Sequence, residues 1–485
     1  MITFNKKKIY LMCLGFLVFS FYIPFLSNIN KFSLLPEEKI NPIQPTIKTS
    51  NQGYIDDPGQ ELFWFIHVTD THFNNPQSVT NYNIFFNTSY HNINPLFIIN
   101  TGDLVHGDLG PEFETVPEQW EDYRDVLDDN NINLSVYIDL IGNHDVSLTS
   151  LNHYYYLTYS MLGSELGQAN YSFVKSFSFG NYAFICLNLS KNSDYDWLQF
   201  YYNGYLYQDQ LDWYESKLEE YKDYDGIFTF GHHPIYRPDP EWPFGIYGID
   251  SEDSTSGVGF NELNNEYNIT CYISGHTHDN FIQQRDNTNY FDIETADFDK
   301  QHAYRIFAID HGQISTSTET IETWPQGVIT YPPTTMFLDD EYDPSKAKIR
   351  VLAWDPNGIS SIAWSAYNAI DAQVTNWAPM SKVSTDEPLW EGDWNSILND
   401  GSDYKIKVNI TGGSGETIKE IMYAFEYIPP EDPPDDPPDD PPDDPNDGFP
   451  NNPQDLGLIP IIIIGGIIIT AISITGAVIH RSRSR

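Results

Sequence analysis

Cysteine is scarce in this chain, with only three among 485 residues. Cys13 lies in an apolar run near the N-terminus, and Cys186 and Cys271 each lie in the middle of an apolar, strand-like segment. So few thiols argue against a disulfide framework, an iron–sulfur cluster and a closed cysteine-rich zinc site. We expect Cys186 and Cys271 to be small buried side chains, with a single bridge between them as the alternative.

Basic residues are also few: 25 Lys and Arg stand against 69 Asp and Glu, for a formal net charge of -44. Such a surface repels a phosphate backbone unless metal ions or a local basic pocket intervene, so nucleic-acid binding is not expected. Hydrophobic residues make up 40% of the chain and aromatic residues 15%. This composition and length are sufficient for two globular domains with real cores.

The N-terminus has the pattern of a secretory signal. Lys6, Lys7 and Lys8 precede an uncharged apolar run over residues 9–26. This is the order of a basic region and a hydrophobic region, but no clean small-x-small cleavage site follows. Residues 1–30 are therefore predicted to be a signal peptide or an uncleaved signal anchor, with a linker over residues 31–58.

The C-terminus is predicted to cross a membrane. Residues 456–479 are apolar and uncharged, which is long enough for a transmembrane helix, and Arg481, Arg483 and Arg485 follow in a short tail over residues 480–485. Positive residues at both ends favour the cytoplasmic side, so the body should lie outside the cell or in a lumen. We expect a single-pass protein of the cell membrane whose ectodomain is tethered at its C-terminus.

A proline- and aspartate-rich repeat, PPEDPPDDPPDDPPDDPN, comes just before this apolar run. Proline keeps the backbone extended and the like charges repel one another. Residues 429–455 are therefore predicted to be a stiff stalk.

Five apolar runs in the first two thirds of the chain end on polar residues that can bind metal. Between them lie segments with helical character, such as residues 117–127 and 207–218. Alternating strands and helices predict an α/β layered fold, in which ligands gather at the carboxyl ends of the strands. The polar ends are Asp70-x-His72, Gly102-Asp103, Gly142-Asn143-His144-Asp145, Gly231-His232 and Gly275-His276-x-His278.

In this order, the motifs resemble the signature of the calcineurin-like metallophosphoesterase superfamily, which also includes the purple acid phosphatases. The resemblance extends from about Phe63 to Thr316. It implies a domain over residues 59–322 with a four-layer α/β/β/α sandwich around a site for two metal ions. Transferred residue by residue, it implies that Asp70, His72 and His278 hold one ion, that Asn143, His232 and His276 hold the other, and that Asp103 bridges them.

The residue types agree with this reading, because imidazole and carboxylate ligands suit Mn, Fe or Zn. In purple acid phosphatases a tyrosine binds ferric iron at the third position after the bridging aspartate, whereas this chain has His106 there. The tyrosinate-bound iron branch is therefore disfavoured, and the identity of the metal stays open.

Four other side chains near the motifs have predicted roles. His144 matches the position expected to contact the phosphate and protonate the leaving oxygen, with Asp145 as its orienting partner, or else it is a structural histidine. His233 either reaches the substrate or is a bystander. His67, inside the first strand, is predicted to be a packed core residue.

Alternating strands after residue 322 predict a second module, over residues 323–428. Runs such as residues 346–353 and 404–410 are separated by turns such as Asp355-Pro-Asn-Gly358. An immunoglobulin-like or fibronectin-like β-sandwich of about a hundred residues is the natural interpretation. It either contacts a surface partner or serves as a spacer.

Taken together, these features predict a membrane-anchored phosphoesterase that hydrolyses phosphate mono- or diesters by attack of metal-bound hydroxide. One alternative is a surface binding or adhesion protein that has lost catalysis and keeps a structural metal site. Another is a metal-dependent hydrolase of a non-phosphate ester, since the same residues would serve that reaction.

Overall fold

The computed structural model describes residues 53–107, 114–146, 150–190, 203–238, 246–284, 288, 290–334, 348–394 and 404–423. The predicted signal, residues 31–52 of the linker, the stalk, the apolar run over 456–479 and the basic tail all lie outside these ranges. Within the described ranges, every helix is too short or too polar to span a bilayer.

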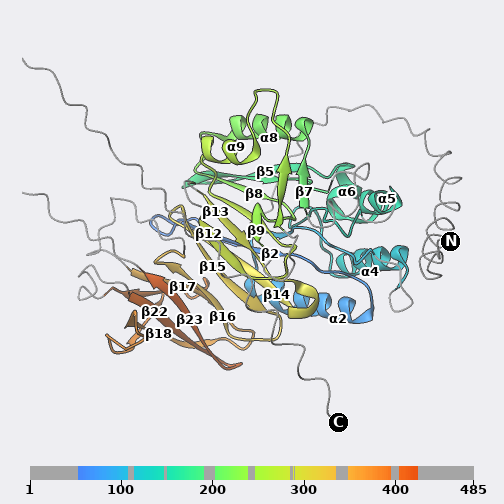
Figure 1. Ribbon diagram of the computed structural model, residues 1–485. Coiled ribbons are helices and arrows are strands. Elements are labelled where there is room, and N and C mark those ends of the chain that lie inside the picture. The colour runs from blue at the N-terminus through green and yellow to red at the C-terminus, as the bar shows by residue number, and fades with distance from the viewer. Residues whose placement is uncertain are drawn as a thin grey trace, which may run out of the picture. The chain divides into compact units, whose positions relative to one another are not determined.

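Six strands form the first sheet, in the order β15-β14-β2-β3-β4, with β1 paired to the first residues of β2. Figure 1 labels β15, β14 and β2 of this sheet. Strands β2, β3 and β4 are parallel, and β14 pairs with β2 in the antiparallel direction. The strands are β1 (Tyr54–Ile55), β2 (Leu62–Val68), β3 (Ile98–Asn100), β4 (Tyr137–Asp139), β14 (Ala303–Asp310) and β15 (Gln313–Thr320).

A second sheet has the order β12-β13-β11-β8-β6-β5, in which β13, β11, β8 and β6 are parallel. Its strands are β5 (Tyr171–Phe177), β6 (Gly180–Cys186), β8 (Gly226–Phe230), β11 (Cys271–Ser274), β12 (Phe281–Gln284) and β13 (Phe291–Glu294). A small sheet of β7 (Asn203–Leu206), β10 (Ile246–Ser251) and β9 (Tyr236–Pro238) lies in the same part of the chain.

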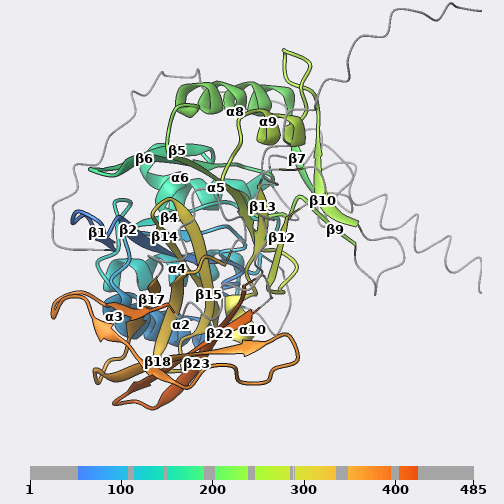
Figure 2. The same cartoon turned by 90° about the vertical axis from the view of Figure 1, so that its left-hand side faces the viewer.

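Helices cover the outer faces of both large sheets (Figure 2). Apolar side chains of α8 and α9 pack on β6 and β8, and those of α2 and α4 pack on β2 and β14. The arrangement is therefore helix, sheet, sheet and helix, and the predicted α/β class is confirmed. The helices are α2 (Pro76–Ile84), a π-helical segment η2 (Phe85–Tyr90), α3 (His91–Ile93), α4 (Val116–Asp129), α5 (Ser150–Tyr159), α6 (Met161–Leu166), α8 (Gln208–Tyr221), α9 (Phe260–Glu266) and α10 (Phe298–Gln301).

The sequence of β2 explains its central place. All seven residues are buried, because successive side chains of a strand point to opposite faces and both faces are covered. Phe63 and Phe65 enter the core between the two sheets, whereas Trp64 and Ile66 enter the core beneath the helices. Cys186 and Cys271 lie in the core between the sheets as buried free thiols, as predicted.

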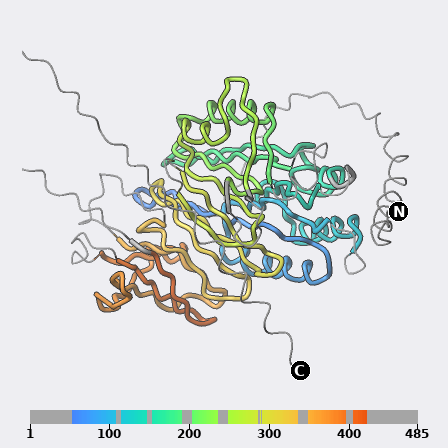
Figure 3. The backbone as a smooth tube through the Cα atoms, viewed as in Figure 1, coloured from blue at the N-terminus to red at the C-terminus, as the bar shows by residue number. Residues whose placement is uncertain are grey.

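Beyond residue 325 the chain forms two four-stranded antiparallel sheets that share a core, seen in Figure 3 as the orange-to-red part of the trace. Their orders are β16-β17-β21-β20 and β19-β18-β22-β23. A β-sandwich is thus present, while its immunoglobulin-like or fibronectin-like character and the boundary at residues 322 and 323 stay predictions. The strands are β16 (Gln326–Tyr331), β17 (Lys348–Trp354), β18 (Ile359–Asn368), β19 (Ala378–Pro379), β20 (Ser381–Lys382), β21 (Leu389–Asp393), β22 (Tyr404–Gly412) and β23 (Glu416–Tyr423).

This sandwich packs directly against the α/β part of the chain. The rings of Trp64 and Trp354 lie 5.9 Å apart in one continuous apolar core. Arg350 donates through Nε to Asp310 Oδ2 at 2.9 Å, and both side chains are buried. The two parts therefore share one apolar core over the described residues.

Candidate metal centre

Every predicted ligand lies just after the carboxyl end of a strand. Asp70 and His72 follow β2, Asp103 follows β3, Asn143 follows β4, His232 follows β8, and His276 and His278 follow β11. Backbone hydrogen bonds join the first two loops, from Asp70 N to Gly102 O at 3.0 Å and from His72 N to Asp103 O at 2.9 Å. The loops after β2 and β3 therefore lie side by side at one edge of the first sheet.

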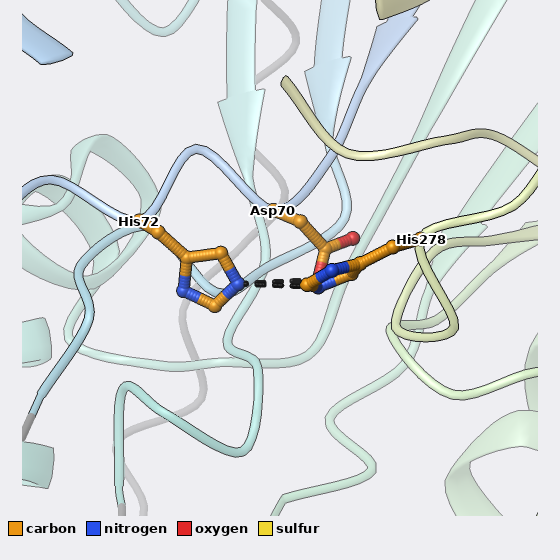
Figure 4. A group of neighbouring side chains, drawn as sticks. All are labelled: Asp70, His72 and His278. Carbon is orange, nitrogen blue, oxygen red and sulfur yellow. Dashed lines mark hydrogen bonds and ion pairs between the residues drawn. The ribbon is translucent and has the colours of Figure 1, made fainter. Parts of the chain in front are cut away.

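The first group comprises Asp70, His72 and His278 (Figure 4). His278 Nε2 lies 3.3 Å from Asp70 Oδ1, and His72 Nε2 lies 3.7 Å from the same oxygen. The two Nε2 atoms face each other at 3.4 Å. Three ligand atoms therefore converge on one point, as a coordinated cation requires.

The second group comprises Asp103, His232 and His276, whose ligand atoms lie within 4.8 Å of one another. His232 Nε2 lies 3.2 Å from Asp103 Oδ2 and 3.0 Å from Asn143 Oδ1. The predicted amide ligand thus lies beside the predicted imidazole ligand of the same ion.

Asp103 connects the two groups. Its Oδ2 lies 3.7 Å from His72 Nε2, while Oδ1 accepts the backbone N–H of His144 at 2.8 Å. Asp103 is 1% exposed, so water screens its charge little and the charge acts strongly on neighbouring groups. This is the position that a bridging carboxylate would take.

His144 lies at the edge of the centre, with Nε2 3.9 Å from Asp103 Oδ2. Its Nδ1 lies 2.6 Å from the backbone carbonyl oxygen of His106. A carbonyl oxygen only accepts, so this contact holds the Nδ1 proton and leaves Nε2 directed at the centre.

Asp145 has partners that differ from the one expected. Its Oδ2 accepts the backbone N–H groups of Gly142 at 2.8 Å and Leu104 at 3.2 Å, and its Oδ1 accepts that of Val105 at 3.1 Å. The carboxylate is therefore used to join the loop after β3 to the loop after β4. The orienting contact to His144 Nδ1 comes from a backbone carbonyl instead.

Five of the predicted ligands have a left-handed backbone, with φ of 53° at Asp70, 41° at His72, 52° at Asp103, 78° at His276 and 62° at His278. Residues other than glycine rarely adopt this backbone conformation, and each instance costs about 1–3 kcal/mol. Gly142 is required nearby, because a Cβ there would lie 2.2 Å from Asp103 N. The ligand loops are thus tightly turned and closely packed.

Electrostatics divides the four imidazoles into two pairs. Burial is the main reason that the pKa of His72 and that of His276 fall to about 3, followed by the charges of neighbouring histidines. Burial would also lower the pKa of His232 and His278, but Asp103 and Asp70 respectively outweigh it and raise each to about 9. Each carboxylate therefore faces one protonated imidazole when no cation is present.

The donor set fits metal ions. His232 Nδ1 is a buried nitrogen without a hydrogen-bond partner among the described residues, and Asp70 Oδ1 lies 3.3 Å and 3.7 Å from two imidazole nitrogens. Polar groups of this kind are costly to bury, and a metal ion held by them would offset that cost. Imidazole, carboxylate and amide oxygen are ligands that Mn, Fe and Zn accept.

The remaining histidines have distinct surroundings. His233 is fully buried, with its ring centroid 4.4 Å from that of His276, so its role stays open between substrate contact and support. His106, where a tyrosine would bind ferric iron, has its ring 5.6 Å from that of His72. His67 is a buried core residue, as predicted, and both ring nitrogens contact threonine hydroxyls.

Two polar side chains outside the motifs also hold the ligand loops. The hydroxyl of Thr69 donates to Asp70 Oδ2 at 2.7 Å, and Asn100 Oδ1 accepts the backbone N–H of Gly102 at 3.1 Å. Neither residue belongs to a predicted motif. Their only signal is that each is a polar residue at the end of an otherwise apolar strand, next to a ligand.

The family model for calcineurin-like phosphoesterases matches residues 63–280, which contain all seven predicted ligands. This chain carries a calcineurin-like phosphoesterase domain. The predicted membership of the metallophosphoesterase superfamily is confirmed.

Curated relatives of this metallophosphoesterase domain come from distant organisms. Transmembrane protein 62 of Mus musculus is 25% identical over 333 residues, which are 63% of this chain and 48% of that protein. A putative metallophosphoesterase of Arabidopsis thaliana is 22% identical over 59% of this chain and 43% of its own length. A 3′,5′-cyclic-nucleotide phosphodiesterase of Nostoc sp. is 26% identical over 43% of this chain and 66% of its own. The chain thus spans less than half the length of the first two relatives.

Proposed function

We propose that this protein is a metal-dependent phosphoesterase that hydrolyses phosphate mono- or diesters at a centre of two metal ions. The observation that carries the proposal is the position of Asp103, whose carboxylate lies 3.2 Å from His232 and 3.7 Å from His72. One acid between two ligand groups is the arrangement that a pair of cations needs. Asp70, His72 and His278 would hold one ion, and Asn143, His232 and His276 the other.

Two such ions, when bound, supply Lewis-acid charge to phosphoryl oxygens and make an activated water available near neutral pH. They would also attract an anionic substrate, which the net negative charge of the chain would otherwise repel. The identity of the ions among Mn, Fe and Zn is part of the proposal to be tested.

His144 is proposed to bind the phosphate and to protonate the leaving oxygen. With Nδ1 occupied by the carbonyl of His106, Nε2 is the atom that presents or receives a proton. Its ring contacts the edge of His72 at a centroid distance of 4.8 Å, so it lies beside the first ligand group. The carbonyl contact keeps the ring orientation fixed during proton transfer.

The position of the enzyme at a membrane is also a proposal. It is supported by the uncharged run over residues 456–479, by the three arginines after it and by the word "transmembrane" in the name of the mouse relative. The outward orientation rests on the basic residues at both ends of the chain.

The full chain, stripped of metal in detergent, should regain activity toward p-nitrophenyl phosphate or its bis ester when Mn²⁺, Zn²⁺ or Fe²⁺ is restored. Asp103→Ala should abolish this recovery, because both groups lose their shared carboxylate. The preferred ester would decide between mono- and diesterase activity. A wild type that binds two ions yet cleaves neither these esters nor natural phosphoesters would favour a binding protein with a structural metal site, whereas cleavage of carboxylic esters alone would indicate a non-phosphate hydrolase.

A further inference from the structure

The turn that carries His276 and His278 is held by a buried carboxylate from the neighbouring strand. Glu294 is the last residue of β13, is paired with Ser274 at the end of β11, and has 0% exposure. Its Oε1 accepts the backbone N–H of Thr277 at 3.0 Å and also the Thr277 hydroxyl. Thr277 stands between the two histidines, so one carboxylate oxygen fixes the middle of the turn.

The charge of Glu294 has a buried counterpart. Arg305 of β14 is 3% exposed, and its Nη2 donates to the Glu294 backbone carbonyl at 3.0 Å and to Asn280 Oδ1 at 2.9 Å. Arg305 thus holds the main chain of Glu294 from the strand behind the turn. The charge of Glu294 in turn partly offsets the lowering of the Arg305 pKa by burial.

The same contacts continue beneath the centre to the loop of Asp103. Arg305 Nε donates to Thr295 Oγ1 at 3.2 Å, and Thr295 Oγ1 lies 2.7 Å from His67 Nδ1. His67 Nε2 in turn lies 2.9 Å from Thr101 Oγ1, two residues before Asp103. A continuous buried polar chain therefore links the proposed bridging ligand to the His276–His278 turn.

The turn needs such support because both histidines have a left-handed backbone, with φ of 78° and 62°. Strained residues persist only where the surroundings determine them. A second contact acts at the far end, where Gln301 Nε2 donates to the His278 carbonyl at 2.6 Å. Glu294 contacts Thr277, which lies between the two ligands, so a displacement of Thr277 would move both histidines.

We propose that Glu294 is a positioning residue for the metal centre, acting through Thr277 to set the directions of His276 and His278 together. The two histidines would bind different ions, so loss of this contact should weaken the binding of both ions. The proposal rests on the proposed two-metal function, but its direct consequence is metal affinity rather than hydrolysis.

Thr277→Val, which keeps the shape but removes the hydroxyl, tests the proposal against Thr277→Ser, which keeps the hydroxyl. The full chain is stripped of metal and titrated with Mn²⁺ or Zn²⁺ by calorimetry, with bound metal counted after dialysis. We expect Thr277→Val to weaken both binding steps by about 10- to 100-fold, and Thr277→Ser to bind close to the wild type. The unfolding temperatures of the metal-free proteins should stay close to one another.

A purely structural role would instead lower the unfolding temperature of metal-free Thr277→Val and leave its affinity for both ions unchanged, which would overturn the proposal. A cycle with Glu294→Gln adds a second measurement: if the two residues act as one unit, Thr277→Val should weaken binding much less in the Glu294→Gln background. A wild type that binds metal but cleaves no ester would refute the proposed function alone, and a wild type that binds neither ion would refute both.

Discussion

The Nδ1 atom of His144 lies 2.6 Å from the backbone carbonyl oxygen of His106. Since that oxygen can only accept, the proton of the neutral ring is on Nδ1 and the exchangeable position is Nε2, on the side of Asp103. The relationship assigns the proton-transfer atom of the proposed mechanism.

His144→Ala should therefore reduce kcat by about 10²- to 10⁴-fold while metal content stays at the wild-type level. If His144 protonates the leaving oxygen, the loss should be smaller for p-nitrophenyl esters, whose leaving group needs little protonation, than for alkyl phosphoesters. Steady-state kinetics on both ester types measures this. Equal losses for both would argue that His144 contributes phosphate binding rather than a proton.

Asp145→Asn should destabilise the protein by about 1–3 kcal/mol, because both oxygens of Asp145 accept backbone N–H groups and an amide nitrogen cannot. Metal affinity should fall with it, since these bonds join the loops of Asp103 and Asn143. Urea unfolding and metal titration of the variant would check both effects. A variant with normal stability and metal affinity but impaired proton transfer would restore the role as partner of His144.

Because of Lys175, the free energy of unfolding should increase as pH rises from about 8 to 10.5. Burial lowers the pKa of Lys175 from 10.5 to about 8, so below pH 8 the folded protein holds a buried charge that the unfolded chain would hydrate. The unfolded chain binds more protons between these two values, and stability therefore increases as pH rises through that range. At about 1.4 kcal/mol for each pKa unit, the total is on the order of 3 kcal/mol.

Lys175→Met should accordingly be more stable than the wild type at pH 7, and the difference should shrink between pH 8 and pH 10.5. Urea unfolding of both proteins across this range provides the measurement, and other titrating groups cancel in the comparison. A difference that does not change with pH would show that packing, and not the charge, separates the two proteins.

Trp354→Ala should lower the free energy of unfolding by about 3–5 kcal/mol, because its ring is 6% exposed and fills a core shared by the sandwich and the α/β part. Trp377 lies in the same sandwich but is 38% exposed, so it is the matched control. Trp377→Ala should change the free energy of unfolding by no more than about 0.5 kcal/mol. Denaturant unfolding should show one transition for both. Separate transitions for the two parts in the wild type would contradict a shared core.

Much of the centre could be predicted because its ligands stand at the ends of apolar runs. Strands β2, β3 and β8 end just before Asp70, Asp103 and His232, as the apolar runs predict, and side chains at the carboxyl ends of parallel strands converge. The apolar runs therefore predict that these loops meet, whereas the assignment of each ligand to an ion comes from the resemblance to the calcineurin-like superfamily.

The supporting contacts left no such trace. The orienting group of His144 is a main-chain carbonyl, which any residue at position 106 would offer. Glu294 looks like an ordinary acid at a strand end, and its role depends on the parallel pairing of β11 with β13. The sandwich was predicted from alternation, but the burial of Arg350 against Asp310 depends on how two distant segments pack, which local periodicity does not encode.

Strand β14 lies between β2 and β15, yet it begins at Ala303, beyond the last residue of the segment that matches the family. A fragment trimmed to residues 63–280 would leave the edge of β2 without its antiparallel neighbour and would remove Phe307 and Ile309 from the core between the sheets. It would also lack Glu294. The segment that the family model matches is therefore shorter than the α/β part that its strands complete, and a truncated form should extend through β23 to keep the core that the two parts share.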